Sequence, residues 1–176
     1  MPHIHTEAGQ HDHTVSAYIV RLDRKEPALL LHTHKLLKVY LQFGGHVELD
    51  ENPWQAIIHE IAEESGYDMS QLKILQPTSR IKRMSDAVMH PYPVSMLTHK
   101  FAELDHYHSD TAFAFVTHEP PAQKIGEGES ADVMEFTAKE LRALPHSKIP
   151  GNAQETGLFV LEDCLKNWEA VSTSGF

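Results

Sequence analysis

The chain has 176 residues, 41% of them hydrophobic, and a formal net charge of −10 at pH 7. This length suits one domain with a single core. The acidic balance excludes a general binder of DNA or RNA backbones, which needs a basic surface, but it leaves small nucleotides open. One cysteine, Cys164, and the lack of a ~20-residue apolar run or signal-peptide core lead us to expect a cytoplasmic protein without a membrane partner.

The first segment, residues 1–13, is polar and has no hydrophobic periodicity. We expect a flexible N-terminal arm there, followed by a single domain over residues 14–176. The arm contains four histidines, His3, His5, His11 and His13. Histidine is a common metal ligand, so adventitious nickel or zinc binding and a dedicated metal site both stay open.

Three stretches of β-branched, aromatic and leucine residues follow, at 14–21, 28–32 and 38–43. Short turn segments separate them. The pattern predicts strands that lead into the glycine pair Gly44 and Gly45.

A helix is predicted directly after these glycines. Asn52 can cap the first backbone N–H groups, Pro53 fits the first helical position, and Gln55 completes a capping box. Gly66 stands where a left-handed residue ends a helix.

This helix has two faces at 100° per residue. Its apolar stripe, expected to face the core, consists of Trp54, Ile57, Ile58 and Ile61. The opposite face carries three carboxylates that meet at one patch of solvent, Glu60, Glu63 and Glu64. Like charges destabilise a helix unless they are neutralised, so the patch is either a solvated acidic face or a site for a hard divalent cation, Mg²⁺ or Mn²⁺.

The whole segment resembles the Nudix box. The matching positions are Gly45, Glu51, Glu60, Ile61, Glu63, Glu64, Gly66 and Tyr67. One position departs: His59 stands where the family has arginine. The resemblance implies an α/β (α+β) Nudix fold, in which a mixed β-sheet lies between helices and the catalytic motif is a loop–helix–loop.

The resemblance also implies a chemistry. It predicts a metal-dependent hydrolase that cleaves a pyrophosphate bond in a nucleoside diphosphate linked to another group. Mg²⁺, with Mn²⁺ as a substitute, would be held by Glu60, Glu63 and Glu64, and one glutamate would act as general base. Gly44, Gly45, Glu51 and Gly66 would shape the motif. A non-catalytic Nudix-fold domain that binds a nucleotide is the alternative, no substrate is singled out, and a homodimer is expected by analogy alone.

His59 is the position that bears on activity. The family's arginine is taken to orient the box carboxylates, whereas imidazole donates two hydrogen bonds only when it is protonated. Surrounding carboxylates favour the protonated form. We therefore expect activity to survive and to weaken as the solution becomes alkaline.

After the helix, strands are predicted at 71–75 and 94–101, with a basic segment at 78–83 between them. This segment is either a solvated loop or a phosphate contact. In the second interpretation its cations, Arg80, Lys82 and Arg83, pair with substrate phosphates.

A second polar group, His106, His108 and Asp110, precedes a strand at 111–117. On an extended chain these alternating side chains point the same way. A substrate pocket, a second metal site and a polar surface all stay open. His46, directly after the glycines, is interpreted either as a substrate or metal contact or as a packing residue.

The loop at 119–131 carries Glu127 and Glu129 before a strand at 133–136. In Nudix enzymes the corresponding loop often supplies the general base or a further metal ligand, and Glu129 is the residue chosen here. A helix capped by Thr137 with Glu140 is predicted next. The last helix is predicted over 154–171, with a core-facing stripe of Leu158, Leu161, Leu165 and Trp168.

Overall fold

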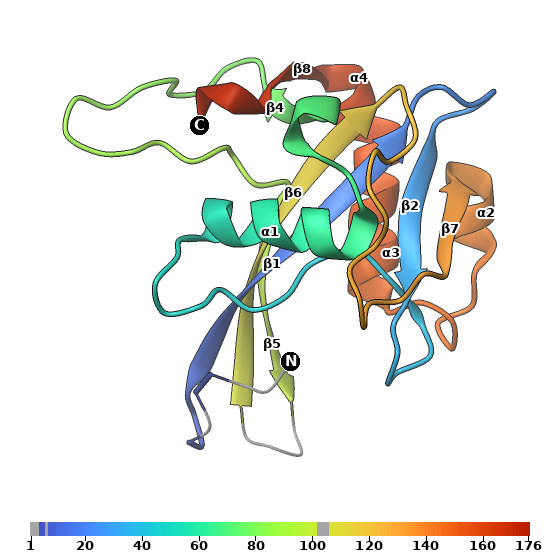
Figure 1. Cartoon of the computed structure of the whole chain (residues 1–176), viewed down its shortest axis with the longest axis horizontal. Helices are drawn as coiled ribbons and strands as arrows, with labels where there is room; N and C mark the ends of the chain where they lie inside the picture. The colour runs from blue at the N-terminus through green and yellow to red at the C-terminus, as the bar shows by residue number, and fades with distance from the viewer. Residues whose placement is uncertain (1–3, 6, 102–105) are drawn as a thin grey trace.

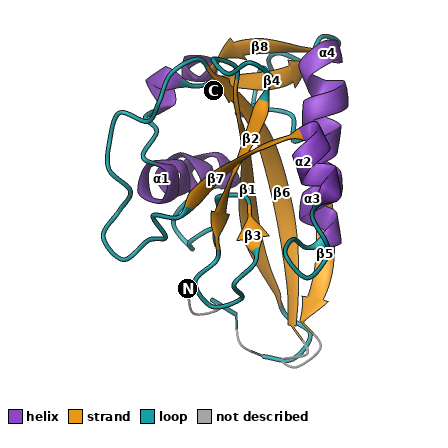
Figure 2. Ribbon diagram, turned by 90° about the vertical axis from the view of Figure 1, so that its right-hand side faces the viewer, coloured by secondary structure: helices purple, strands orange, loops and turns teal. Residues whose placement is uncertain are grey.

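The computed structural model describes residues 4–5, 7–101 and 106–176 and shows one mixed β-sheet with helices on both faces (Figures 1 and 2). The strands are β1 (His11–Arg21), β2 (Ala28–Thr33), β3 (Tyr40–Leu41), β4 (Lys73–Pro77), β5 (Ser95–Phe101), β6 (His106–Thr117), β7 (Val133–Thr137) and β8 (Trp168–Ser172). The helices are α1 (Pro53–Ser65), α2 (Ala138–Ala143), α3 (Gly151–Phe159) and α4 (Leu165–Asn167), with a π-helical turn at Val160–Cys164 and 3₁₀ turns at Met69–Gln71 and Thr173–Gly175.

The sheet is built around one parallel pair of long strands. Its described strands run in the order β3-β2-β1-β6-β4-β8, with β5 paired to β6 and β7 paired to β2. The pairing of β1 with β6 is parallel and places Asp12 beside His108, whereas the other pairings are antiparallel. The predicted fold class, a mixed sheet between helices, is confirmed.

Alternation along β1 and β6 divides the core into two layers. Odd-numbered side chains pack with the apolar stripe of α1 in one layer, made chiefly of Val15, Ala17, Ile19, Phe113, Phe115, Trp54, Ile57 and Ile61. Even-numbered side chains pack under α2, α3 and the π turn in the other, which includes Tyr18, Val20, Ala112, Ala114, Leu141, Ala153 and Val160. Helix α1 thus lies on the opposite side of the sheet from α2 and α3 (Figure 2).

Helix α1 begins and ends where the sequence predicted. The Asn52 side chain accepts hydrogen bonds from the backbone N–H groups of Trp54 and Gln55, and Gln55 completes the capping box. Gly66 closes the helix in the left-handed conformation at φ 71°. These local signals decide the position of the helix.

Two predictions about the faces of α1 were wrong. Ile58 is 36% exposed, because it lies at the border of the stripe and lines a surface pocket of about 480 Å³ with Trp54 and Phe176. Glu60, expected on a patch of solvent, is only 1% exposed. The carboxylate patch therefore extends from solvent into the protein.

The chain end also differs from the prediction. The helical segment begins at Gly151 and stops at Asn167, and Trp168–Ser172 forms β8, which pairs with β4. A leucine periodicity predicted a helix up to residue 171, but an aromatic and valine segment beside an open sheet edge pairs as a strand. Trp168 still packs against the core as expected.

The first strand begins earlier than predicted. Strand β1 starts at His11, so residues 11–13, assigned to a flexible arm, pair with Tyr107–Ser109 of β6. Residues 1–3 and 6 of that arm, His3 included, lie outside the described residues. Among the described residues, no helix is both long and apolar enough to cross a bilayer.

Candidate functional site

The three carboxylates of α1 lie in different surroundings. Glu60 is buried, Glu64 is half-buried and Glu63 is exposed. The backbone N–H of Gly44 donates to Glu64 Oε2 at 2.8 Å. Gly44 itself has φ 141°, and a Cβ there would lie 2.0 Å from the carbonyl oxygen of Val15. Only glycine brings this N–H so close to the helix.

Burial and mutual repulsion disfavour ionisation of this group in the absence of a cation. Burial raises the pKa of Glu60 to about 8, and repulsion by Glu64, Glu63, Glu129 and Glu51 adds to it. Burial likewise raises the pKa of Glu64 to about 7, against the hydrogen bond from Gly44. The carboxylates would accept a positive charge in place of these protons.

The imidazole of His59 lies between two of the motif's glutamates. Its Nδ1 is 2.9 Å from Glu51 Oε2, and its Nε2 is 3.6 Å from Glu60 Oε1. Glu51 in turn accepts a hydrogen bond from the backbone N–H of Glu48 at 2.9 Å. The histidine therefore bridges the loop before α1 to a helix carboxylate.

The loop at 119–131 docks on the C-terminal end of α1 through backbone hydrogen bonds. The N–H of Gln123 donates to the carbonyl of Gly66 at 3.0 Å, and the N–H of Gly126 to that of Glu63 at 2.7 Å. Glu129 is 3.3 Å from Lys35 Nζ and close enough to raise the pKa of both Glu60 and Glu64. Of the two glutamates singled out in this loop, Glu127 is exposed and Glu129 is partly buried toward the helix.

The residues present fit a hard divalent cation. Among the described residues, buried Glu60 Oε1 has no hydrogen-bond partner, and His59 Nε2 is 3.6 Å from it. The surrounding donors are carboxylate oxygens, the ligands that Mg²⁺ and Mn²⁺ prefer. An ion at this point would satisfy the buried oxygen and neutralise the group.

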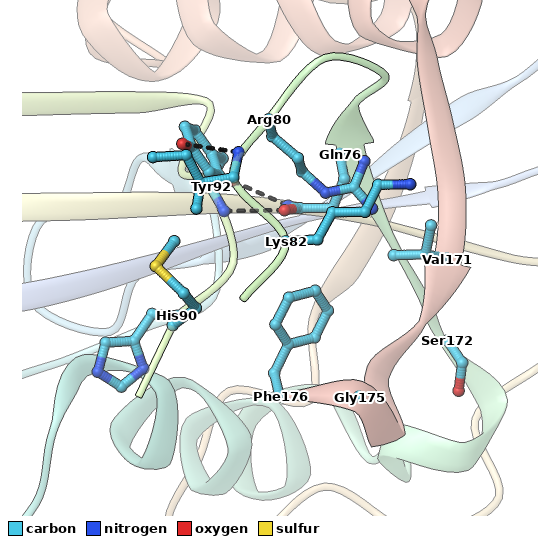
Figure 3. A pocket seen from close by; sticks show the side chains of 11 residues that line it. Gln76, Arg80, Lys82, His90, Tyr92, Val171, Ser172, Gly175 and Phe176 are labelled. Carbon is cyan, nitrogen blue, oxygen red and sulfur yellow. Dashed lines mark hydrogen bonds between the residues drawn. The ribbon is translucent and has the colours of Figure 1, made fainter. Parts of the chain in front are cut away.

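The cations of the basic segment 78–83 have different surroundings. Arg80 forms an ion pair with Glu169 of β8 and donates to the backbone carbonyl of Pro77. It lines a pocket of about 210 Å³ with Gln76, Tyr92 and Phe176 (Figure 3). Arg83 is exposed in the following loop. Arg80 is thus engaged with the end of the chain rather than gathered with the α1 carboxylates.

The second polar group, expected before a strand at 111–117, belongs to β6 itself, which begins at His106. His106 and Asp110 are buried, at 2% and 9% exposure, and His108 is half-buried. Asp110 accepts hydrogen bonds from the hydroxyls of Thr14 at 2.9 Å and Ser16 at 3.0 Å, while burial raises its pKa to about 6. Its carboxylate is directed at β1.

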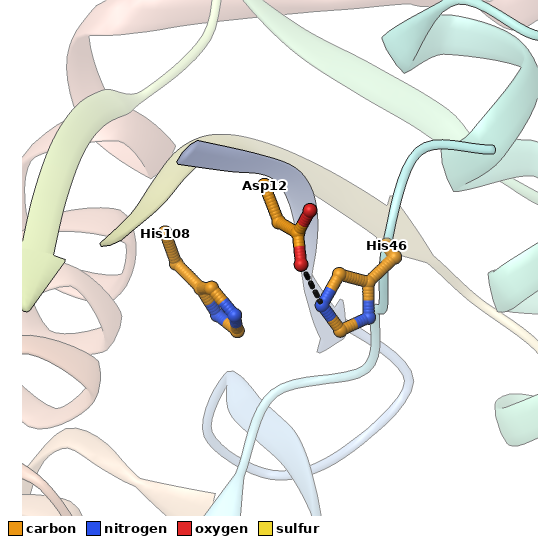
Figure 4. A group of neighbouring side chains, drawn as sticks. All are labelled: Asp12, His46 and His108. Carbon is orange, nitrogen blue, oxygen red and sulfur yellow. Dashed lines mark ion pairs between the residues drawn. The ribbon is translucent and has the colours of Figure 1, made fainter. Parts of the chain in front are cut away.

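His106 and His108 meet a residue that the sequence pattern did not single out, Asp12. His106 Nε2 lies 3.0 Å from Asp12 Oδ2, and His46 Nε2 lies 3.4 Å from the same oxygen. The rings of His46 and His108 are edge-to-face at 4.9 Å. Figure 4 shows Asp12, His46 and His108 directed at a common point. We call these three residues the Asp12 cluster.

Asp12 is fully buried, and burial opposes its charge. Hydrogen bonds from the backbone N–H and ring of His5, from the Ile4 N–H and from His106 nevertheless hold the pKa of Asp12 well below its usual range. The alternation of Asp12, Thr14 and Ser16 was a usable signal for one polar strand face. The parallel register that brings them to β6 has no local signal.

Known proteins of one family match this chain. The family model described as the NUDIX domain matches residues 12–156. A NUDIX-family hydrolase structure from Clostridium perfringens is 26% identical and covers 85% of this chain and 95% of its own, with a TM-score of 0.69. Among curated proteins no sequence matches.

Two further structures share the fold at lower identity. A C. elegans Ap4A hydrolase in a binary complex is 17% identical, with a TM-score of 0.59, covering 82% of this chain and 91% of its own. An ADP-ribose pyrophosphatase from Streptococcus suis is 15% identical, with a TM-score of 0.54, covering 90% of this chain and 96% of its own.

Proposed function

The chain belongs to the NUDIX domain family, and from this premise we propose that it is a metal-dependent hydrolase that cleaves a pyrophosphate bond in a nucleoside diphosphate linked to another group. One observation carries the proposal. Glu60, Glu63 and Glu64 lie close together along α1. The charge of Glu129 raises the pKa of Glu60 and of Glu64, so Glu129 is near both carboxylates. Four acidic groups beside a single paired lysine, Lys35, suit a site that binds Mg²⁺ and a polyanionic substrate together.

The box glutamates are assigned to metal binding. Glu60, Glu63 and Glu64 would hold Mg²⁺, with Mn²⁺ as a substitute. The ion, when bound, would neutralise charge that develops on the phosphoryl oxygens and make hydroxide accessible near neutral pH. The Gly44 N–H fixes Glu64, and His59 connects Glu60 to Glu51.

Glu129 is assigned as the general base, which would take a proton from the attacking water. Its loop is held to α1 by backbone hydrogen bonds, and Lys35 lies beside its carboxylate. A carboxylate on a docked loop can approach the substrate from outside the metal ligands. Arg83, exposed on the 78–83 segment, is assigned to contact substrate phosphates.

The related structures suggest the substrates to try first. Their names include Ap4A hydrolase and ADP-ribose pyrophosphatase. Ap4A and ADP-ribose both contain a pyrophosphate joined to a nucleoside, as do the substrates that we propose for this chain. A panel should hold Ap4A, ADP-ribose, a nucleotide sugar and nucleoside triphosphates.

The test is product release from this panel with Mg²⁺ and with a chelator, on the wild type and on Glu63→Gln. We expect hydrolysis of at least one compound, lost with the chelator and reduced at least about 100-fold in Glu63→Gln. Glu155→Gln, an exposed glutamate on α3, is the matched control and should leave the rate unchanged. Tight nucleotide binding without turnover of any compound would instead identify a nucleotide-binding domain.

A further inference from the structure

The Asp12 cluster joins three segments that are far apart in the sequence. Asp12 of β1 is paired in register with His108 of β6, and a bridge between Thr14 and His46 brings the segment after the glycines beside β1. One ligand atom from each of Asp12, His46 and His108 lies within 4.8 Å of the other two. The arrangement is therefore fixed by the backbone pairing and not by surface side chains alone.

The donor set differs from that of α1. Two imidazoles and one carboxylate suit a divalent transition metal such as Zn²⁺, whereas Mg²⁺ prefers oxygen alone. Ligands bound at about 2.0–2.2 Å lie closer together than 4.8 Å, so modest rotation of the His108 ring closes the site. His108 is half-buried, which leaves a path for the ion.

Hydrogen bonds from residues outside the cluster also fix the orientation of the Asp12 carboxylate. Asp12 Oδ1 accepts from the His5 backbone N–H at 2.9 Å, and Oδ2 accepts from the Ile4 N–H at 3.2 Å. His106 Nε2, 3.0 Å from Oδ2, adds a further contact. Such outer hydrogen bonds are typical of metal sites, because they fix the direction of the ligand before the ion arrives.

We propose that Asp12, His46 and His108 form a second metal site, separate from the α1 carboxylates, that binds a divalent transition-metal ion of the Zn²⁺ type. The ion ties β1 and β6 to the segment after Gly44. Because the Gly44 N–H donates to Glu64, this segment supports the helix carboxylates. The site thus has a structural role that holds the motif's loop in position.

The test is a Co²⁺ titration of the metal-free full chain with excess Mg²⁺ present, followed by the visible absorption of bound Co²⁺. We expect one tight equivalent in the wild type and at least about a 100-fold weaker affinity in His108→Ala. His11→Ala is the matched control. His11 lies next to Asp12 on β1 but stacks on Tyr107, on the other face, so its loss should leave the tight equivalent unchanged.

Two further measurements distinguish this site from metal binding elsewhere in the chain. Zn²⁺ at 100 times its dissociation constant should raise the melting temperature of the wild type and of Glu63→Gln by about 5 °C, but not that of His108→Ala. Equal Co²⁺ affinity in the wild type and His108→Ala would overturn the proposal and assign the ion to other histidines. Loss of the tight equivalent in Glu63→Gln alone would overturn it in favour of α1.

Discussion

Two polar clusters lie on opposite faces of the same sheet, and they handle charge in opposite ways. On α1, glutamates face glutamates, and the pKa values of Glu60 and Glu64 rise to about 8 and about 7. In the Asp12 cluster, a carboxylate faces imidazoles and N–H donors, and the pKa of Asp12 falls. Ionisation is disfavoured in the first arrangement, whereas in the second the protein's own hydrogen-bond donors favour the ionised carboxylate.

The largest effect should come from Gly44, which joins the two regions. Gly44→Ala places a Cβ 2.0 Å from the Val15 carbonyl at a positive φ, so we expect at least about 4 kcal/mol of lost stability in denaturant unfolding. Gly128→Ala also has a positive φ, of 92°, but its Cβ meets nothing within 4 Å. It should cost only about 1 kcal/mol, and equal losses would show that the clash is relieved.

Glu129→Gln should lower kcat at least about 100-fold, because the proposed general base loses its charge. Its neighbour Glu127 is exposed in the same loop, and Glu127→Gln should keep the wild-type rate. The measurement is kcat at saturating substrate and Mg²⁺. Equal rates for the two variants would remove Glu129 from the chemistry and leave proton transfer to the helix carboxylates.

The raised pKa values predict a pH-dependent affinity for Mg²⁺. Glu60 and Glu64 hold protons below about pH 8 and about pH 7, and the ion must displace them. Affinity should therefore increase by roughly 500-fold from about pH 6 to about pH 8 and level off above about pH 9. Calorimetric titration in buffers of different ionisation enthalpy measures both affinity and proton release. An affinity that is independent of pH would contradict the assignment.

Two buried aspartates of the sheet, Asp12 with a lowered pKa and Asp110 with a raised one, can be compared by substitution with asparagine. Asp12→Asn removes the charge that several donors share, so it should cost about 2 kcal/mol in chelator at pH 7. Asp110 has a raised pKa of about 6, so the stability it contributes is present at low pH and lost as pH rises through 6. At pH 7 the buried Asp110 is ionised against the cost of burial, and Asn keeps an acceptor for Thr14 and Ser16, so Asp110→Asn should leave stability unchanged or raise it at this pH. Denaturant unfolding midpoints of both variants, measured across about pH 4 to 8, test the direction of each change in stability.

The smallest effect concerns His59. The ring of His59 lies 2.9 Å from Glu51 Oε2 but 3.6 Å from Glu60 Oε1, which is beyond hydrogen-bond length, whereas a guanidinium has five N–H donors that can reach both carboxylates. His59→Arg should therefore raise kcat about threefold in a steady-state assay. An unchanged kcat would show that the ring acts only as a spacer.

The α1 region was predictable because its determinants are local. Asn52, Pro53 and Gly66 specify where the helix starts and stops, and the 3.6-residue period aligns its glutamates. The burial of Glu60 was not predictable, because it depends on the segments that pack beside the helix. The same limit applies to the last helix, which gives way to β8 because a sheet edge is available there.

The Asp12 cluster shows the opposite case. The alternation of His106, His108 and Asp110 indicated a shared direction, but not what they face. Asp12, which the two histidines meet, is almost a hundred residues away and is brought to them by a parallel register. Register depends on the whole hydrophobic pattern of both strands, and a shift of one residue would turn every side chain over.

The docking of the 119–131 loop on α1 determines which of its residues can be substituted. The loop is held to α1 by the N–H groups of Gln123 and Gly126, which donate to helix-end carbonyls. Backbone hydrogen bonds of this kind do not depend on the side chain that the donor residue carries. Gly66 and Gly126 must stay small, since a Cβ on either would press on the opposite backbone. The side chains of the outer loop residues can therefore be substituted without loss of these backbone hydrogen bonds.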